Sequence, residues 1–243
     1  MGAGNCYSVV AQKVSGLLLL WILYAALFIS YIVYANSPAN DILHILDENG
    51  LSGWEEERFK GKTSYKVVEL EGDQVLQAVS RTSASGIFKR QTVNIKDYPY
   101  LNWRWRIENK LDTGNEMEKS GDDYAARVYL LIDGGLLFWN RRAISYVWAN
   151  RSETGSVWDN AYAGDSVKML ALKSAKDPTR TWLHEKRNVY EDLKAVFGEE
   201  IATVDAVAVM TDTDDSNSTA LTYYADIFFS AERDCLFRKN CCA

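Results

Sequence analysis

The sequence predicts a mainly β protein, a single antiparallel β-sandwich of jelly-roll type with one short helix, preceded by one transmembrane helix. Short β-branched and aromatic runs with a period of two follow residue 54, and turn-forming residues separate most of them. A charge-free apolar run lies near the N-terminus. The 243 residues are 47% hydrophobic and 25% charged, as in ordinary globular proteins. A net charge of −6 without any Lys/Arg-rich run excludes nucleic-acid binding as the main function.

Residues 14–35 form the charge-free run, which at about 1.5 Å per residue covers the roughly 30 Å core of a bilayer. Lys13 precedes it and acidic residues follow it, which places residues 1–13 in the cytoplasm and exports residues 36–243. The run is either an uncleaved anchor in the inner membrane or a signal cleaved after Ala35, where Val33-Tyr34-Ala35 fits the small-x-small pattern. Both alternatives place the C-terminal domain in the periplasm.

Residues 36–53 are expected to form a tether with a short helix. Asp41 can cap the sequence ILHILDE, and Gly50 and Gly53 can end it.

Residues 54–230 are expected to form the sandwich. No helix alternates with the strands, which argues against a doubly wound α/β fold. One helix is expected at YEDLKAVF, starting at or next to Asn188, packing Leu193 against a sheet and ending at Gly198. The predicted strands are 65–70, 75–80, 101–107, 124–132, 144–149, 167–172, 181–189, 204–210 and 221–229.

The tail, residues 231–243, contains Cys235, Cys241 and Cys242. An oxidising compartment permits one disulfide, of Cys235 with either of the others, and leaves one thiol over. The spacing does not fit a zinc site of Cys and His.

Polar residues recur on single faces of three predicted strands. Asn102, Arg104 and Arg106 alternate with Leu101, Trp103, Trp105 and Ile107, and the two tryptophans are expected in the core. If the strands are neighbours, one charged patch forms. Arginine forks and aromatic rings together suit a sugar, whereas solvation alone also explains charges on an open sheet face. The expected patch comprises Arg104, Arg106, Asp123, Arg127, Glu185 and Arg187.

Two acidic loops, 119–123 and 212–217, carry closely spaced oxygen ligands of the kind that calcium takes. The second loop has Asn217 and Tyr223 where an EF-hand needs Gly and Glu, so it is not an EF-hand. The alternatives are a calcium site of another kind at Asp212, Asp214 and Asp215, or a tight turn whose carboxylates accept backbone N–H groups.

The residues that could support catalysis form a less specific pattern than the expected charged patch. A glycoside hydrolase needs two facing carboxylates, and a polysaccharide lyase needs an Arg or Asn beside a Tyr or His. His184 and Arg187 have opposite strand parity, which counts against one lyase cleft. An enzyme of either kind would draw on Asp123, Arg127, Tyr129, Glu185 and Asn188.

Four stretches together resemble the bacterial family Domain of Unknown Function 3047: GDDYAARVYLLID, AISYVWAN, EKRNVYEDLKAVFGEE and VAVMTDTDDSNSTALTYYADIFF. The resemblance covers roughly residues 54–230 and implies a bacterial envelope protein of β-sandwich type. It implies no particular activity. The positions that match the family's polar signature are Asp122, Asp123, Arg127, Trp148, Arg187, Asn188, Asp212, Asp214 and Asp226.

The prediction for function is non-catalytic binding of a glycan or envelope component by a membrane-anchored domain. The alternatives are a lyase or glycoside hydrolase, and an assembly module that binds another envelope protein. The bilayer is the expected partner of residues 14–35, and no cofactor is expected apart from the calcium alternative. The expected ligand-binding residues are Arg104, Arg106, Asp123, Arg127, Tyr129, Trp148, Arg187 and Asn188.

Overall fold

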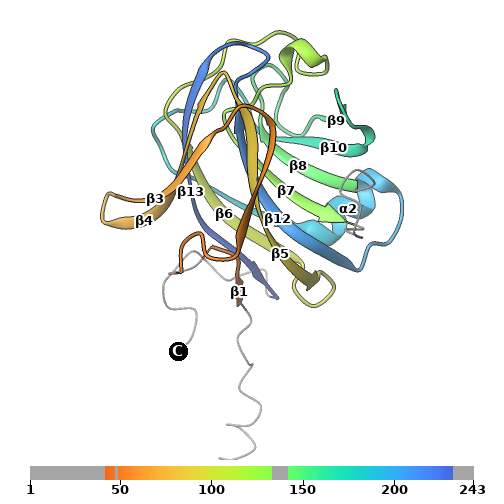
Figure 1. Cartoon of the computed structure of the whole chain (residues 1–243). Helices are drawn as coiled ribbons and strands as arrows, with labels where there is room; N and C mark the ends of the chain where they lie inside the picture. The colour runs from red at the N-terminus through yellow and green to blue at the C-terminus, as the bar shows by residue number, and fades with distance from the viewer. Residues whose placement is uncertain (1–41, 47–48, 133–141, 232–243) are drawn as a thin grey trace, which may run out of the picture. The chain divides into compact units, whose positions relative to one another are not determined.

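A computed structural model describes residues 42–46, 49–132 and 142–231, in which two β-sheets face each other across a shared core (Figure 1). The six-stranded sheet has the order β11 (Leu183–Asn188), β6 (Tyr100–Ile107), β13 (Thr219–Ser230), β4 (Asp73–Arg81), β3 (Ser64–Leu70), and β1 (Ile42–His44) pairs with β13. The seven-stranded sheet has the order β2 (Trp54–Lys60), β5 (Ala84–Asn94), β12 (Thr203–Asp212), β7 (Arg127–Ile132), β8 (Arg142–Trp148), β10 (Gly164–Lys173), β9 (Val157–Asn160).

The predicted sandwich is confirmed, but it is not wholly antiparallel. β8 and β10 run parallel, whereas the other strand pairs of the described residues are antiparallel. The chain between them contributes β9, which pairs antiparallel with β10. A period of two identifies a strand and its faces but not its partner. The sequence alone therefore does not predict that β8 and β10 pair in parallel.

Every predicted strand is present, and the structure adds β1, β2, β5 and β9. β1 corrects the expectation of a short helix after Asp41, because Ile42–His44 pairs with Phe228–Ser230 of β13. β4 pairs only with residues 219–224 of β13, so the second half of β13 can supply hydrogen bonds to β1, and these override a weak local helix signal in so short a segment.

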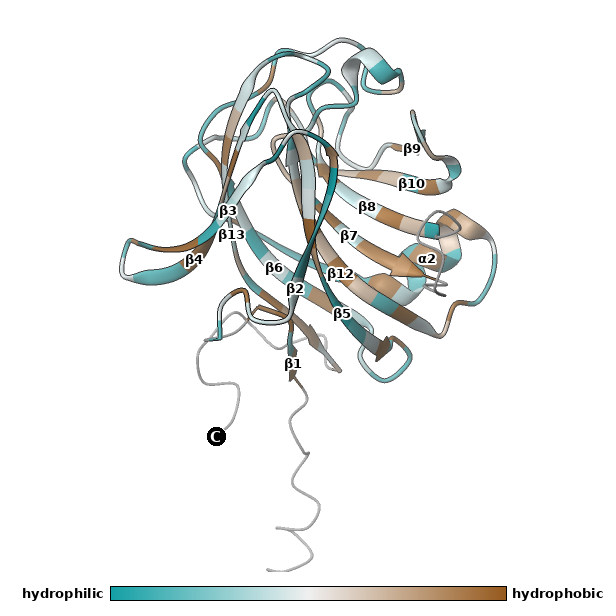
Figure 2. Ribbon diagram, viewed as in Figure 1, coloured by the Kyte–Doolittle hydropathy of each residue, from teal (hydrophilic) through white to brown (hydrophobic). Residues whose placement is uncertain are grey.

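The strands of both sheets contribute alternate side chains to the core. In Figure 2, apolar positions, coloured brown, recur along these strands. Trp103 and Trp105 have no exposed surface, which confirms their prediction as core residues. Their rings meet edge to face with centroids 5.5 Å apart. The alternate residues of β6, which include Arg104 and Arg106, therefore point away from the core.

Helix α2 (Val189–Phe197) is confirmed with both predicted ends. The Asn188 side chain accepts a hydrogen bond from the Glu191 backbone N–H, and Gly198 ends the helix at φ +73°. Leu193 is fully buried, so the apolar side of the helix joins the core. A single 3-10 turn, η1 (Lys119–Gly121), lies in the first acidic loop.

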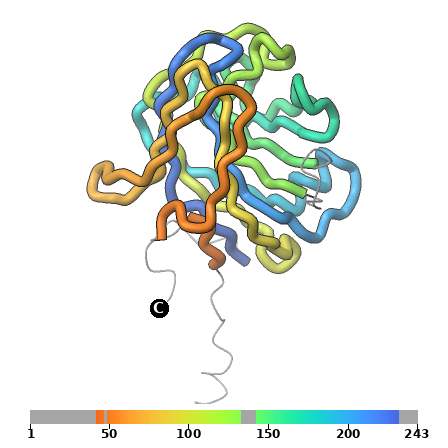
Figure 3. The backbone as a smooth tube through the Cα atoms, viewed as in Figure 1, coloured from red at the N-terminus to blue at the C-terminus, as the bar shows by residue number. Residues whose placement is uncertain are grey.

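Strands β3 and β4 form a hairpin that projects beyond the rest of the six-stranded sheet (Figure 3). Its two-residue turn is Glu71-Gly72, and both residues have positive φ, as the twist of a tight hairpin requires.

Among the described residues, no helix is both long enough and apolar enough to cross a membrane. The predicted membrane segment at 14–35 and the cysteine tail from 232 onward lie outside the described residues, as do 36–41 and 47–48 of the tether.

Candidate functional site

The outer face of the six-stranded sheet has aromatic and charged side chains from β4, β6 and β13 and from Trp182, which directly precedes β11. In the register, Arg104 lies opposite His184 of β11 and Ala225 of β13. Arg106 lies opposite Tyr223, which in turn lies opposite Gln77 of β4. We call this group the platform; its members are Asp73, Gln77, Arg104, Arg106, Trp182, Tyr223 and Asp226.

Two half-exposed aromatic rings lie on the platform. The rings of Trp182 and Tyr223 have centroids 6.5 Å apart and are tilted by 55°. The Arg104 guanidinium lies 4.5 Å from the centroid of the Trp182 ring, and Gln77 donates a hydrogen bond of 3.2 Å to the Tyr223 hydroxyl. The rings are therefore held in place by polar neighbours on the same face.

Each platform arginine is held by two carboxylates. Arg104 pairs with Asp73 at 2.7 Å and with Asp226 at 2.5 Å. Arg106 pairs with Glu71 and Glu108, each at 2.6 Å. Asp226 reaches Arg104 from a break in the β13–β6 register, where its backbone takes a φ of +52°. A strained backbone at a bulge often re-aims a side chain, and here it completes the ion pair.

His184 lies on the same face as Arg104. Burial and the charge of Arg104 lower the pKa of His184, while Asp226 acts in the opposite direction. The imidazole is therefore uncharged at neutral pH.

A second group of predicted residues surrounds Arg127 and lies apart from the platform. Arg127 points away from the core of the seven-stranded sheet, but its side chain is only 3% exposed. It donates to Asp212 from Nε at 3.1 Å, forms a further close ion pair with that carboxylate, and lies 3.7 Å from Asp122. The rings of Tyr124 and Tyr129 lie 4.6 and 5.9 Å from its guanidinium carbon. Burial raises the pKa of Asp122 and of Tyr129.

Glu185 and Arg187 belong to neither group. They lie on the core-facing side of β11, because they pair with Trp103 and Leu101 of β6. Glu185 accepts from Trp105 Nε1 at 3.0 Å and pairs with Lys173 at 3.0 Å, and burial raises its pKa. Arg187 pairs with Asp192 of α2 at 2.5 Å.

The structure thus corrects the expected single patch. It places Arg104 and Arg106 on the platform, Arg127, Asp123 and Tyr129 around the other sheet, and Glu185 and Arg187 on the side of β11 that faces the core residues. Trp148 is buried in the core and donates to the Ser174 carbonyl, and Asn188 caps α2. Alternation along one strand does not reveal which faces different strands share.

The acidic loops meet, although not as expected. Carboxylate oxygens of Asp123, Asp214 and Asp215 lie within 4.8 Å of one another, whereas Asp212 is paired with Arg127. Asp123 accepts from the backbone N–H groups of Asp215 and Ser216, Asp215 accepts from the Tyr162 hydroxyl at 2.9 Å, and Asp214 lies 3.5 Å from Lys60. These bonds fasten one loop to the other. Carboxylate oxygens suit calcium, and a calcium site here stays a prediction.

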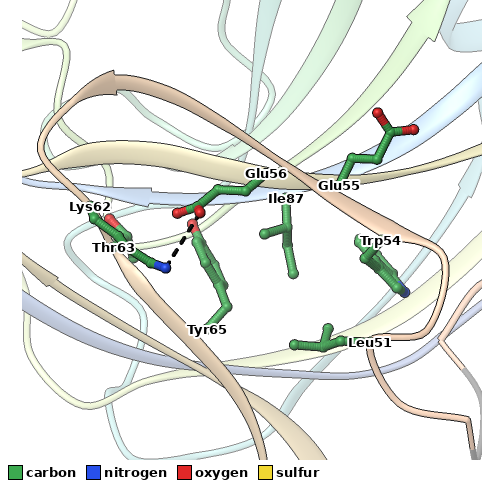
Figure 4. Close-up of a pocket in the computed structure, with 8 residues that line it drawn as sticks. All are labelled: Leu51, Trp54, Glu55, Glu56, Lys62, Thr63, Tyr65 and Ile87. Carbon is green, nitrogen blue, oxygen red and sulfur yellow. Dashed lines mark ion pairs between the residues drawn. The ribbon is translucent and has the colours of Figure 1, made fainter.

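A small pocket of about 120 Å³ opens beside β2 (Figure 4). Apolar side chains and two aromatic rings form most of its wall, and the Glu56–Lys62 ion pair of 3.5 Å lies at one end. In Figure 4 the indole nitrogen of Trp54 points away from the other lining side chains. The pocket has room for a few water molecules. Its lining residues are Leu51, Trp54, Glu55, Glu56, Lys62, Thr63, Tyr65 and Ile87.

Arg104 and Arg106 are predicted ligand-binding residues, whereas the sequence alone does not identify Trp182, Tyr223, Gln77 and Asp73 as their neighbours. The signal for Trp182 was present, because it shares the parity of His184. Its use required the register of β11 against β6, which only the structure supplies.

Comparisons with solved structures give low similarity. A meso-active thermostable cellulase derived from Cel12A of Rhodothermus marinus is 11% identical, with a TM-score of 0.38 and coverage of 71% of this chain and 98% of that chain. A family 11 carbohydrate-binding module from Clostridium thermocellum, in complex with a β-1,3-1,4-mixed-linked tetrasaccharide, is 11% identical, with a TM-score of 0.40 and coverage of 78% and 95%. The xyloglucanase domain of NopAA from Sinorhizobium fredii, in complex with cellobiose, is 10% identical, with a TM-score of 0.40 and coverage of 72% and 92%.

No curated protein matches the sequence. The family model described as "Protein of unknown function (DUF3047)" matches residues 52–228. This match covers most of the chain and nearly all of the described sandwich. The chain therefore belongs to the DUF3047 family.

Proposed function

We propose that the protein binds an oligosaccharide on the platform without cleaving it. The observation that carries the proposal is the placement of the Trp182 and Tyr223 rings beside Arg104 on one outward sheet face. A pyranose ring presents an apolar face, which stacks on an aromatic ring, and a rim of hydroxyls, which needs fixed donors and acceptors. The platform offers both within a few ångströms.

The fixed polar groups suit binding because their positions are set before the ligand arrives. Ion pairs to Asp73 and Asp226 hold Arg104, and Gln77 holds the Tyr223 hydroxyl. A preformed site loses less conformational entropy on binding than a mobile one.

The carboxylates support binding rather than catalysis. A general acid needs a raised pKa and access to the scissile bond. The described carboxyl groups with a raised pKa are Asp122, Glu185 and Asp215, and they lie away from the platform. Glu185 is also buried and bonded to Trp105 and Lys173. On the platform itself, Asp73 and Asp226 are ion-paired with Arg104.

We also propose a cellular location for the protein. Residues 14–35 anchor the chain in the inner membrane or act as a cleaved signal, and a jelly-roll-like sandwich presents the platform to the periplasm. The charge-free run and the charges that flank it support this orientation. Protease protection in spheroplasts tests it, since residues 54–230 should be digested from the periplasmic side.

Titration of the purified full-length chain with a panel of oligosaccharides tests the binding. We expect one class to bind, and Trp182→Ala to weaken it about tenfold through loss of stacking. Phe59→Ala is the matched control, because Phe59 is a 64% exposed aromatic residue on β2 of the other sheet. Its affinity should equal that of the wild type.

Chromatography of the sugar after incubation tests the absence of cleavage. The oligosaccharide should be recovered at its original length. Shortened or unsaturated products would support the hydrolase or lyase alternative. A panel without any bound sugar, together with a stable protein partner in pull-downs, would support the assembly alternative.

A further inference from the structure

We propose that the platform selects oligosaccharides without carboxylate or sulfate groups over anionic ones of the same length. This inference rests on the proposed function and names its ligand class. It is carried by the ion pairs that already occupy both platform arginines.

Arginine recognises an anionic sugar by offering two parallel N–H groups to its carboxylate. On the platform this capacity is occupied. Arg104 binds two carboxylates, Asp73 and Asp226, and Arg106 binds two more, Glu71 and Glu108. The side chains of the two arginines are only 13% and 14% exposed, so little of either guanidinium is open to a further anion.

The other basic groups beside Trp182 do not supply an anion site, whereas the exposed Lys66 of this face lies on β3, the edge strand opposite to β11. The lowered pKa of His184 leaves its imidazole uncharged at neutral pH. The Lys186 ammonium lies 5.1 Å from the centroid of the Tyr100 ring, at the far end of the β11–β6 pairing from Trp182. Arg180 lies beside Glu108, at 3.8 Å. A uronate stacked on Trp182 would therefore meet the carboxylates of Asp73 and Asp226 without an uncommitted guanidinium beside it.

A neutral sugar meets no such repulsion. Its hydroxyls can donate to the carboxylate oxygens while the ion pairs stay in place. The stacking of a pyranose face on Trp182 or Tyr223 depends little on charge. Binding of a neutral sugar should therefore change little between low and moderate salt.

The experiment compares a neutral oligosaccharide with a uronate oligosaccharide of equal length, each titrated into the full-length chain by calorimetry at neutral pH. We expect the uronate to bind about tenfold more weakly. The Asp73→Asn/Asp226→Asn double variant should raise the ratio of uronate affinity to neutral affinity several-fold, because Arg104 then carries an uncompensated charge. Asparagine tolerates the positive φ of residue 226, so the backbone should be retained, and circular dichroism checks the fold.

The outcomes separate the inference from the proposed function. Equal or tighter uronate binding that is lost in Trp182→Ala overturns the inference and leaves the binding function standing. An unchanged ratio of uronate affinity to neutral affinity in the folded double variant also overturns it. If neither sugar binds, the proposed function fails and the inference fails with it.

Discussion

Arg127 joins segments that are far apart in the sequence, because it contacts both Asp212 at the end of β12 and Asp122 in the first acidic loop. Both partners of the Arg127–Asp212 pair are nearly fully buried, with 3% and 2% of the side chain exposed. A buried pair is costly to break, because removal of one partner leaves a charge without compensation. Asp122, Arg127 and Asp212, which belong to the family-like stretches, are therefore buried together as paired charges.

Arg127→Met should lower the free energy of unfolding by about 3–5 kcal/mol, because Asp212 would remain buried without its partner. Urea unfolding followed by circular dichroism measures the change. Arg58→Met is the matched control, since Arg58 is 56% exposed and solvent screens its ion pair with Glu56, so the loss of stability should be far smaller. A loss in Arg127→Met as small as that of the control would show that water reaches Asp212.

Asp215 should destabilise the folded protein at neutral pH. Burial and the carboxylates of Asp214 and Asp123 raise its pKa above the unfolded value, despite the Tyr162 hydrogen bond. The folded state therefore binds the proton more tightly, and stability falls as pH rises through the folded pKa. Asp215→Asn should raise the free energy of unfolding at pH 7 by less than about 1 kcal/mol, and this gain should vanish at pH values below the unfolded pKa. Paired urea titrations at the two pH values measure it.

The same variant tests the calcium prediction. A bound cation would stabilise the folded state by mass action, so calcium should raise the melting temperature of the wild type and not that of Asp215→Asn. A wild type whose melting temperature does not change with calcium, combined with a stabilised variant, would leave the loop as a hydrogen-bonded turn.

Asn188 is the N-cap residue of helix α2. Its side chain accepts the Glu191 N–H at 3.2 Å, which satisfies one of the free donors of the first turn. Asn188→Ala should cost about 1 kcal/mol in urea unfolding, and Asn188→Asp should restore most of it. Oligosaccharide affinity should equal the wild-type value in both variants. A loss of affinity in a fully folded Asn188→Ala protein would return this residue to the ligand-binding group in which the sequence analysis placed it.

The strands that sequence analysis missed have patterns that differ from clean alternation. Residues 84–88 of β5 are buried on both faces, so that stretch shows no period of two, and β2 is a polar edge strand. β9 has only four residues. The helix was predicted accurately because its signals are local: Asn188 and Gly198 mark its two ends within the sequence itself.

At the scale of the whole molecule, the candidate site depends on register more than on composition. Arg104 and Arg106 could be predicted from parity along β6 alone. Their aromatic neighbours Trp182 and Tyr223 come from segments far away in sequence, and strand pairing brings them together. Single-strand patterns carry no information on such pairing, which is why the expected patch combined residues from both sheets.

Hydrogen bonds across the core also tie the two sheets together. The Tyr224 hydroxyl of β13 donates to the Met210 carbonyl of β12 at 2.8 Å and lies 2.9 Å from Thr211 Oγ1. The Tyr65 hydroxyl of β3 donates to the Ser85 carbonyl at 2.7 Å. Each bond joins the six-stranded sheet to the seven-stranded sheet, so the sheets should unfold together.

Tyr224→Phe should therefore lower the free energy of unfolding by about 1–3 kcal/mol, because it leaves buried backbone groups without their partner. Tyr223→Phe is the matched control on the preceding residue, which is half-exposed and whose hydroxyl accepts from Gln77. Its change should stay within about 0.5 kcal/mol. In both variants the near-ultraviolet and far-ultraviolet circular dichroism transitions should coincide. If tertiary signals are lost at a lower urea concentration than strand signals in Tyr224→Phe alone, the sheets unfold separately and the hydroxyl bonds, rather than the shared apolar core, couple them.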